Sequence, residues 1–414
     1  MPEAINGGAD GRSTCVIAGG GPAGLMLGVL LARSGVAVTV LEKHADFLRD
    51  FRGDTIHPST LEIMAELGWL DEFLTLPHQK VHRLTAQFGG TPVVVADLTH
   101  LPVRAPYVAM MPQWDFLNFL AEKGRHYPSF RLLMETEATA LIESEGRVVG
   151  VVAETASGER QIRAKLTVAA DGRGSVLRDA SGLPLEDLGA PMDALWFALP
   201  RAPSDTEETQ GRFDAGRIFI MLNRGDYWQC AFVIAKGAFN GVKAAGLAAF
   251  RDGLRPLLPE SVPGERADAI REWGQVKLLT VQVNRLQRWW RPGFLAIGDA
   301  AHAMSPIGGV GVNLAVQDAV AAANALVEPL LAGRAEDGHL AAIEARRRFP
   351  TRATQRLQLV LQNSIIAPTL AAAGPVRPPL ALRLIGAVPM LGRIPARLLG
   401  LGFRPEHVRT RAQA

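Results

Sequence analysis

One run of the chain, from Thr14 to Glu42, limits the possible folds more than any other: TCVIAGGGPAGLMLGVLLARSGVAVTVLE. Gly19, Gly21 and Gly24 lie between a β-branched segment and an apolar helical segment, and a second Val-rich segment ends at Glu42. Such glycines allow a tight turn, close approach of the backbone to a pyrophosphate, and close packing of helix on strand. The helix start offers free N–H groups and the positive end of its dipole, and Glu42 is placed to accept hydrogen bonds from ribose hydroxyls. The run therefore predicts a Rossmann-like strand–helix–strand unit that binds a dinucleotide.

A second glycine-rich helix start follows much later, in RPGFLAIGDAAHAMSPIGGVGVNLAVQDAVAAANAL. Here an apolar strand ends at Gly298-Asp299, and the glycines of residues 308–311 begin another helix. Between the two units, AKLTVAADGRGSVLRDASG ends a strand at Asp171. Acids at several strand ends suit a ligand that carries many hydroxyls and stretches across the sheet. NAD alone does not need the second helix start, whereas FAD, with its ribityl chain and flavin ring, does.

These three segments occur in the order and at the spacing of a known family. The chain resembles the class A flavoprotein monooxygenases, typified by para-hydroxybenzoate hydroxylase, over residues 12–330. One departure is Val310, which stands where many members have a polar or basic residue. Its side chain cannot bond to the flavin, so we expect backbone N–H groups to make that contact.

The resemblance implies an α/β fold with two interleaved domains. A Rossmann-like FAD-binding domain of the glutathione-reductase type is expected at residues 12–75, 103–187 and 286–330. An antiparallel substrate-binding sheet is expected at 76–102 and 188–285, with one helix near 243–255. Residues 1–11 are expected to be disordered, and residues 331–414 to form a helical, Arg-rich region, the chain being helical from about residue 312 onward.

The resemblance also implies the chemistry: NAD(P)H reduces non-covalently bound FAD, and the reduced flavin takes up O2 as a C4a-hydroperoxide that hydroxylates the substrate. The residues that it assigns to FAD binding are Gly19, Gly21, Pro22, Ala23, Gly24, Glu42, Lys43, Arg52, Gln113, Ala138, Asp171, Arg178, Gly298, Asp299, Gly309, Gly311, Val312 and Asn313. Arg52 is also expected to help receive NAD(P)H, and a surface ion pair with Asp50 or Asp54 is its alternative. Pro306 is expected to face the substrate, and Asp171 and Arg178 are expected to serve the NAD(P)H path as well as the cofactor.

Several other residues leave their role open. His302, next to the Gly-Asp pair, is interpreted as a structural imidazole. His57 either reaches the pocket or begins a helix before Pro58. Neither histidine is assigned a role in proton transfer. Trp196, Tyr227 and Trp228 either line an aromatic pocket or pack in a strand core.

Composition excludes some classes of protein. The two cysteines, Cys15 and Cys230, form no C-x-x-C, which argues against a disulfide reductase, a metal cluster or a secreted disulfide framework. No metal site is predicted. There is no interleaving of aromatic and basic residues that would indicate nucleic-acid binding. No run of about 18 uninterrupted apolar residues predicts a membrane span, and the expected compartment is the cytoplasm.

Charge is unevenly distributed although the net charge is only +3. Residues 345–414 contain twelve arginines and a single acid, Glu406. This region is either a helical cap on the acidic body, which Pro389 and Pro395 favour, or an amphipathic element on an anionic membrane surface. A homodimer is left open.

The sequence thus predicts an NAD(P)H- and O2-dependent hydroxylase of an aromatic or polyketide-like small molecule. A flavin-dependent reductase or desaturase of an isoprenoid or other apolar substrate is the alternative. A non-catalytic flavoprotein that binds a partner through its C-terminal helices is the third reading.

Overall fold

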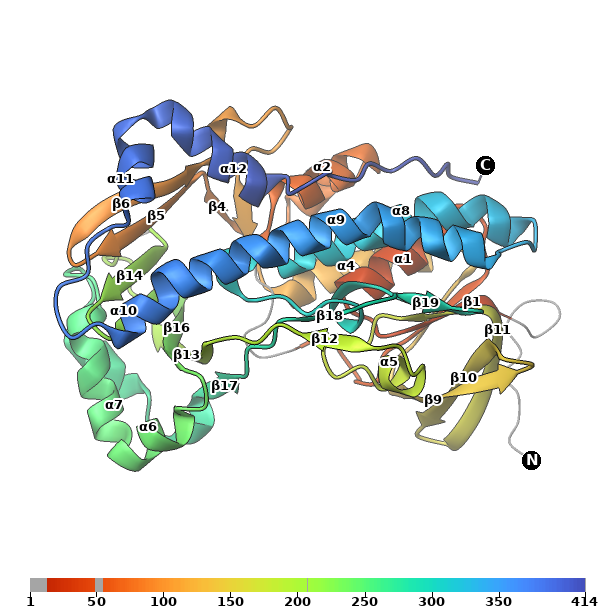
Figure 1. The fold of residues 1–414 in the computed structure, drawn as a ribbon, viewed down its shortest axis with the longest axis horizontal. Coiled ribbons are helices and arrows are strands. Elements are labelled where there is room, and N and C mark those ends of the chain that lie inside the picture. The colour runs from red at the N-terminus through yellow and green to blue at the C-terminus, as the bar shows by residue number, and fades with distance from the viewer. Residues whose placement is uncertain (1–12, 49–54, 207, 414) are drawn as a thin grey trace.

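The computed structural model describes residues 13–48, 55–206 and 208–413. Two large sheets lie side by side, with helices packed on each and one long helix, α9 (Asp337–Leu361), crossing the molecule (Figure 1). The mixed α/β architecture that the sequence predicts is confirmed. Arg52 and residues 1–11 lie outside the described residues.

The first sheet has a parallel centre in the order β20, β11, β1, β2, β8. Its strands are β1 (Ser13–Ala18), β2 (Val38–Leu41), β8 (Phe130–Leu133), β11 (Gly158–Ala169) and β20 (Phe294–Ala296), with β19 (Trp290–Arg291) antiparallel at one edge. β10 (Arg147–Thr155) extends it by antiparallel pairing to β11, and β9 (Thr136–Ser144) pairs antiparallel with β10. The central strands β1 and β2 are almost wholly buried because both faces of a parallel sheet are covered.

Helices cover this sheet. α1 (Pro22–Arg33) contacts both α4 (Gln113–Arg125) and α8 (Gly311–Leu331). α8 is long and apolar enough to cross a membrane, but 78% of its apolar window is buried inside the protein. α8 is therefore a helix of the protein core. The sequence analysis did not detect its apolar character, because it contains no uninterrupted run of apolar residues. The remaining short helices of this half are α2 (Pro58–Glu66), α3 (Leu70–Phe73) and α5 (Val176–Ala180).

The second sheet has the order β17, β13, β16, β15, β14, β5, β6 and draws on two distant chain segments. Its strands are β5 (Arg83–Phe88), β6 (Thr91–Asp97), β13 (Met192–Pro200), β14 (Gln210–Asp214), β15 (Arg217–Asn223), β16 (Tyr227–Ala235) and β17 (Lys277–Leu279). Neighbouring strands are antiparallel except for β14 and β5. Two small sheets join the parts: β3 (Thr55–Ile56), β7 (Val108–Met110) and β4 (Gln79–Val81), and β12 (Leu185–Asp187) with β18 (Asn284–Leu286).

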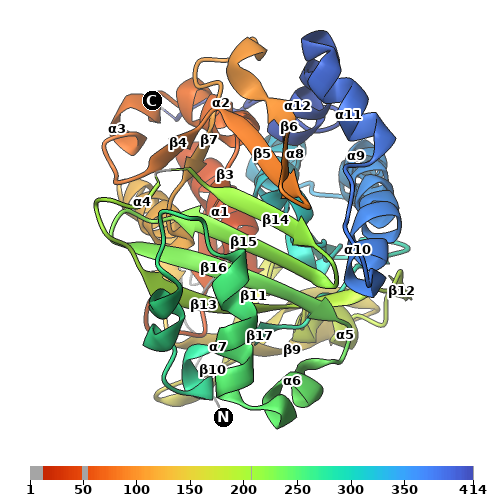
Figure 2. The same cartoon turned by 90° about the vertical axis from the view of Figure 1, so that its left-hand side faces the viewer.

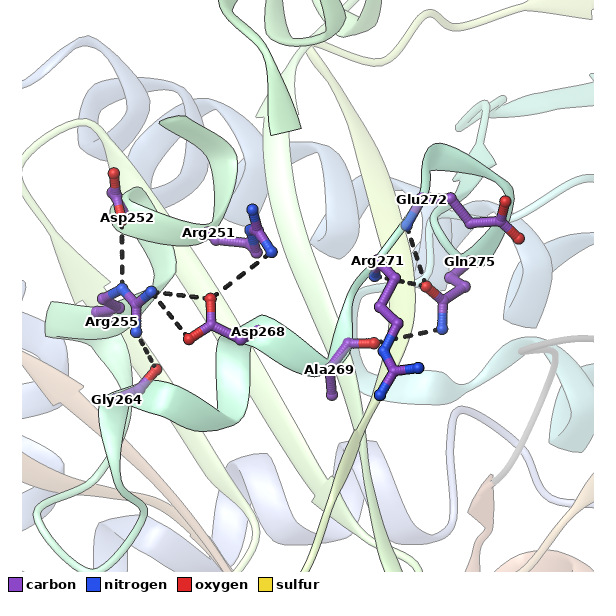
Figure 3. Close-up of polar contacts among 9 residues, drawn as sticks. All are labelled: Arg251, Asp252, Arg255, Gly264, Asp268, Ala269, Arg271, Glu272 and Gln275. Carbon is purple, nitrogen blue, oxygen red and sulfur yellow. Dashed lines mark hydrogen bonds and ion pairs between the residues drawn. The ribbon is translucent and has the colours of Figure 1, made fainter. Parts of the chain in front are cut away.

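Helices α6 (Phe239–Ala245) and α7 (Leu247–Leu254) cover one face of the second sheet (Figure 2). The expected single helix near 243–255 is wrong, because Gly246 adopts a positive φ that ends one helix before the next begins. Figure 3 shows how this layer is fastened: Arg255 donates to Asp252, to both oxygens of Asp268 and to the carbonyl of Gly264.

The C-terminal part contains a π-helical turn (Gln362–Ile366) that continues α9, then α10 (Ala367–Ala371), α11 (Leu380–Ala387) and α12 (Arg393–Gly400). α11 and α12 pack on β6 and so cover an edge strand of the second sheet. The expectation that the chain stays helical to its end is wrong: residues 402–413, here called the C-terminal tail, contain no helix. The tail instead bonds its backbone to side chains and backbone of the first sheet's helices.

Candidate active site

The ends of four parallel strands meet at one edge of the first sheet. Ala18 of β1 pairs with Leu41 of β2 and with Ala169 of β11, and Ala169 in turn pairs with Ala296 of β20. The segments that follow these strands are the first glycine loop, Glu42, Asp171 and Gly298-Asp299. The register therefore brings the acids and glycines that the sequence singled out to one carboxyl edge, where ligands bind in open α/β sheets.

The first glycine loop is built for a ligand at its helix start. A Cβ on Gly24 would lie 1.9 Å from the carbonyl oxygen of Gly19, so only glycine permits this packing of helix on loop. A Cβ on Gly21, in contrast, would meet nothing within 4 Å. α1 starts at Pro22 with Ala23 behind it, its N-cap residue Gly21 has no side chain to cap it, and its first turn holds no acid. An uncapped helix start beside open space fits a pyrophosphate.

Glu42 holds this loop from the neighbouring strand. Its carboxylate accepts hydrogen bonds from the backbone N–H of Gly20, at 3.0 Å, and of His44, at 3.1 Å, and the residue is 8% exposed. Lys43 points elsewhere, to an exposed ion pair of 3.3 Å with Glu137. Ala138 lies next to that acid on β9, buried in the core of the first sheet.

An arginine that the sequence reading passed over lies between Asp171 and Asp299. Arg173 Nε donates to Asp299 Oδ2 at 3.0 Å, and its Nη1 is buried with no hydrogen-bond partner among the described residues. Asp171 accepts from Ser175 Oγ at 2.5 Å, and burial raises the pKa of Asp171 above its usual value. An unsatisfied buried donor beside an acid indicates that a polar ligand belongs here. The signal for Arg173 was its place two residues after Asp171.

Arg178 binds the backbone of Arg173. It is buried, its Nε pairs with Asp179 at 2.9 Å, and its Nη1 donates to the carbonyl oxygen of Arg173 at 3.0 Å. The described contacts of Arg178 are thus with the segment that carries Arg173.

Asp318 of α8 binds the backbone of the Gly-Asp segment. Asp318 Oδ2 accepts from the backbone N–H of Gly298 at 3.1 Å and lies 2.5 Å from His302 Nε2. Burial, the largest influence, raises the pKa of Asp318, but His302 and Arg347 outweigh it and hold the pKa below its usual value. His302 is buried against Trp289, with ring centroids 4.9 Å apart, which agrees with its structural reading. Asp318 was missed because its partners are distant in sequence.

The second glycine loop is tied to the start of α2. Thr55 Oγ1 donates to the carbonyl of Gly309 at 2.9 Å, and Asn313 Oδ1 accepts from His57 N–H at 3.0 Å and from Thr60 Oγ1 at 2.7 Å. The N-cap residue Val310 makes no side-chain hydrogen bond to the start of α8, where Gly311 and Val312 lie. The side chain of Asn313 is thus used for structure, which leaves backbone N–H groups for a ligand.

His57 is fixed rather than poised for proton transfer. Its Nδ1 lies 2.9 Å from the carbonyl oxygen of Leu399, which can only accept, so this nitrogen carries the proton. Burial lowers the pKa of His57 to about 4, so the ring is neutral near pH 7. Its place directly before α2 supports the reading as a helix-start residue.

Three glutamines of the C-terminal region clamp the segment before Pro306. Gln358 donates to the carbonyls of Ser305 and Ile307 at 2.9 and 3.0 Å and accepts from the Ser305 N–H at 3.2 Å. Gln355 donates to the carbonyl of Ala303, and Gln362 to Ser305 Oγ. Positions 355, 358 and 362 share one helix face, a spacing that was visible in the sequence without revealing its partner.

The second sheet presents its other face to this loop. Ile307 packs against an apolar cluster on that face that contains Met192, Ile218 and Val233. Because side chains alternate along a strand, Trp196 shares the face of Met192, and its indole N–H is buried without a partner among the described residues.

Trp228 lies on the opposite face, where it is fully buried in the core under α7 and donates to Asp205 at 3.2 Å. The three aromatic residues that looked alike in sequence are therefore divided: Trp228 is core, Trp196 faces the loop of Ile307, and Tyr227 is half-buried.

Gln113, which is expected to reach the ribityl chain, is the first residue of α4 and is half-buried. Together, two uncapped helix starts, acids at three strand ends and the unpaired Arg173 nitrogen match the phosphates, hydroxyls and ring of FAD.

Comparison with known proteins agrees with this geometry. The family model described as "FAD binding domain" matches residues 12–357. The 6-methylpretetramide 4-monooxygenase of Streptomyces rimosus is 32% identical over 378 residues, which cover 90% of this chain and 89% of the relative.

Solved structures share the fold. PqsL, a probable FAD-dependent monooxygenase from Pseudomonas aeruginosa, superposes with a TM-score of 0.73 at 24% identity and covers 87% of this chain and 98% of its own. The p-nitrophenol 4-monooxygenase PnpA from Pseudomonas putida DLL-E4 gives 0.75 at 19% identity, covering 93% and 96%.

Proposed function

The chain belongs to the FAD-binding-domain family of para-hydroxybenzoate hydroxylase-like flavoprotein monooxygenases, and from this premise we propose that it hydroxylates a flat, oxygen-bearing polycyclic aromatic of polyketide type in the cytoplasm. The overall reaction consumes NAD(P)H, a proton and O2, and forms the hydroxylated product, water and NAD(P)+. Bound FAD supplies the redox chemistry, passing two electrons from NAD(P)H to O2 so that one oxygen atom enters the substrate.

The residues proposed to hold FAD follow the carboxyl edge. The uncapped start of α1 at Gly21 takes the pyrophosphate, Glu42 the ribose hydroxyls, and Asp299 with Gln113 the ribityl chain. Arg173 orients Asp299 through their ion pair of 3.0 Å.

The ring is proposed to lie at the second glycine loop. The backbone N–H groups of Gly311, Val312 and Asn313 face its pyrimidine end, where a helix start favours the negative charge that forms on reduction. Val310 adds no polar side chain there. Arg52 keeps its proposed role at the ring and in receiving NAD(P)H, and Asp171 with Arg178 is proposed to shape that path.

The substrate class rests on one observation: the face of the second sheet that meets Ile307 is broad and apolar, with few polar groups. Its strands contribute Ile220 and the indole of Trp196, while Ile218 and Val233 on the same face are buried with Ile366 and Leu370 of the C-terminal region. Phe88 and Phe213 stack at 4.6 Å between centroids further along the sheet. Such a wall suits the face of a fused-ring system, and the buried indole N–H suits one oxygen acceptor on it. The relative that acts on 6-methylpretetramide supports the same class.

A labelling experiment tests the proposal. Purified protein with FAD and NAD(P)H is incubated under 18O2 with 6-methylpretetramide, anhydrotetracycline, 1-naphthol and p-nitrophenol. We expect one labelled oxygen atom in a product of a polycyclic compound. Turnover confined to the monocyclic phenol would contradict the substrate class. An oxidised or reduced product without label would instead favour the reductase or desaturase.

A further inference from the structure

The C-terminal tail lies along the helices of the FAD-binding part. Glu66 of α2 accepts from His407 Nδ1 at 2.5 Å and from the Val408 N–H at 2.7 Å. Asn324 of α8 exchanges hydrogen bonds with the backbone of His407 and Arg409, each 2.8 Å long. At the end of α1, Arg33 and Ser34 donate to the carbonyls of Thr410 and Arg411. The tail is thus docked by side chains from three helices.

One residue of the tail is buried between arginines of α9. Glu406, the single acid of residues 345–414, is 4% exposed, and its Oε1 accepts from Arg346 Nε at 2.7 Å and from Arg347 Nη1 at 3.3 Å. Arg347 is 0% exposed and donates its Nε to Asp318 Oδ1 at 2.8 Å. The other oxygen of Asp318 holds the backbone N–H of Gly298, the residue directly before Asp299.

These contacts form a continuous buried chain: Glu406, Arg347, Asp318, Gly298. A buried guanidinium is stable only when its charge and N–H groups are matched, and among the described residues Arg347 forms ion pairs with just these two carboxylates. Its Nη2 already has no hydrogen-bond partner among the described residues, so no local acceptor is in place to substitute for Glu406.

We infer that Glu406 is a positioning residue of the flavin site, acting through Arg347 and Asp318 on the segment that carries Asp299. Loss of the Glu406 charge leaves Asp318 as the one carboxylate that Arg347 pairs with, so Arg347 and the carboxylate of Asp318 shift toward each other and out of their present positions. Asp318 then holds Gly298 less firmly, and Asp299 is less well placed for the ribityl chain. The tail is therefore a part of the cofactor site and more than a cover over it. The inference rests on the proposed position of FAD at this edge.

The test separates this chain of contacts from simple docking. Apoprotein is titrated with FAD, and the dissociation constant and the thermal midpoint of the apoprotein are measured for wild type, Glu406→Gln, Glu406→Asp and Glu66→Gln. Glu66→Gln is the matched control, because Glu66 docks the same tail without contacting Arg347 or Asp318 in any described contact.

We expect Glu406→Gln to raise the FAD dissociation constant about tenfold, equivalent to about 1.4 kcal/mol. Glu406→Asp, which keeps the carboxylate, should recover most of the loss and the visible spectrum of the bound flavin. Glu66→Gln should lower the thermal midpoint but change the constant less than about twofold, a ratio worth under 1 kcal/mol. Equal weakening by Glu66→Gln and Glu406→Gln, or no weakening by Glu406→Gln, would overturn the inference.

A second measurement needs no variant and covers a Glu406→Gln protein that does not fold. Coupling between two sites is reciprocal, so FAD should slow hydrogen exchange at the Val408 and Gln413 amides of wild type. Unchanged exchange in the tail on FAD binding would contradict the inference. Failure of wild type to bind FAD at all would instead contradict the proposed function.

Discussion

Arg173 and Asp299 are 126 positions apart in the sequence and form an ion pair of 3.0 Å, from Nε to Oδ2, between the ends of β11 and β20. This pair joins the Asp-Gly and Gly-Asp segments, which the sequence presents as separate motifs. Both side chains are about one-third exposed, so the pair is partly screened and accessible to a ligand.

The Arg173 pair gives the first prediction. Because a partly exposed pair contributes only about 0.2–1 kcal/mol, Arg173→Gln should weaken FAD binding by a factor of about 1.4 to 5. Arg173→Lys should not restore it fully, since an ammonium lacks the fork of donors. Titration of apoprotein with FAD measures both, and full retention in Arg173→Gln would show that the pair does not orient Asp299.

Alanine substitutions at two glycines of the first loop should impair different properties, folding in one case and FAD binding in the other. Gly24→Ala places a Cβ 1.9 Å from the Gly19 carbonyl oxygen, so we expect a misfolded or strongly destabilised protein. Gly21→Ala meets nothing within 4 Å, so its apoprotein should melt near the wild-type temperature while losing FAD affinity, because the methyl group occupies the proposed pyrophosphate space. Thermal unfolding and FAD titration distinguish the two, and tight FAD binding by Gly21→Ala would move the pyrophosphate elsewhere.

His57 should make folding sensitive to mild acid. Its pKa falls from 6.5 in the unfolded chain to about 4 in the folded protein, so the unfolded state binds the proton first as pH drops. The stability from this residue is fully present above pH 6.5 and is lost as pH falls toward 4, by an amount on the order of 3 kcal/mol. His57→Gln, whose amide can still donate to Leu399, should flatten the change in free energy of unfolding over that range. The pKa of Asp318 lies below its usual value in the folded protein, so this carboxyl changes the free energy of unfolding only at a lower pH than His57 does. An unaltered slope in the variant would assign the acid sensitivity to other groups.

The glutamine clamp should affect turnover more than cofactor binding. Gln358→Leu removes three hydrogen bonds to the segment around Pro306, and kcat/KM should fall about tenfold, the effect of losing about 1.4 kcal/mol of positioning. FAD affinity should stay near wild type. Arg356→Ala, an exposed change on the same helix, is the control and should leave both unchanged. A parallel loss of FAD in Gln358→Leu would show that the clamp serves the cofactor instead.

Trp196 and Trp228 offer a matched pair of aromatic substitutions. Trp196→Phe keeps the ring but removes the buried indole N–H, so KM for the best polycyclic substrate should rise about three- to tenfold, the worth of one neutral hydrogen bond. Trp228→Phe breaks the bond to Asp205 in the core, so it should lower the thermal midpoint with little change in KM. If Trp196→Phe leaves KM unchanged, the indole is packing and not a substrate contact.

Local signals were enough to predict the first strand–turn–helix unit and the end of the strand that follows it. Gly24 and Glu42 are informative because their spacing encodes the turn and the next strand end. The division between Trp196 and Trp228 could not be seen, since it depends on strand register and on which face the helices cover. Gln358 had a visible helical spacing, but its partner lies 53 positions away. Asp318 and Glu406 were out of reach for the same reason: a buried ion chain has no local pattern.

The docking of the tail on α1 has a consequence for when, during synthesis of the chain, FAD can be bound. The first glycine loop and α1 leave the ribosome long before the tail does, yet the backbone at the end of α1 accepts the Gln413 N–H at 2.8 Å. Glu406 likewise emerges long after Gly24. Because domains fold as their residues emerge, a flavin site that depends on Glu406 stays incomplete until the tail has emerged, and FAD loading at full affinity follows that event. A tag fused behind the tail, whose Gln413 bonds to the end of α1, should slow that loading.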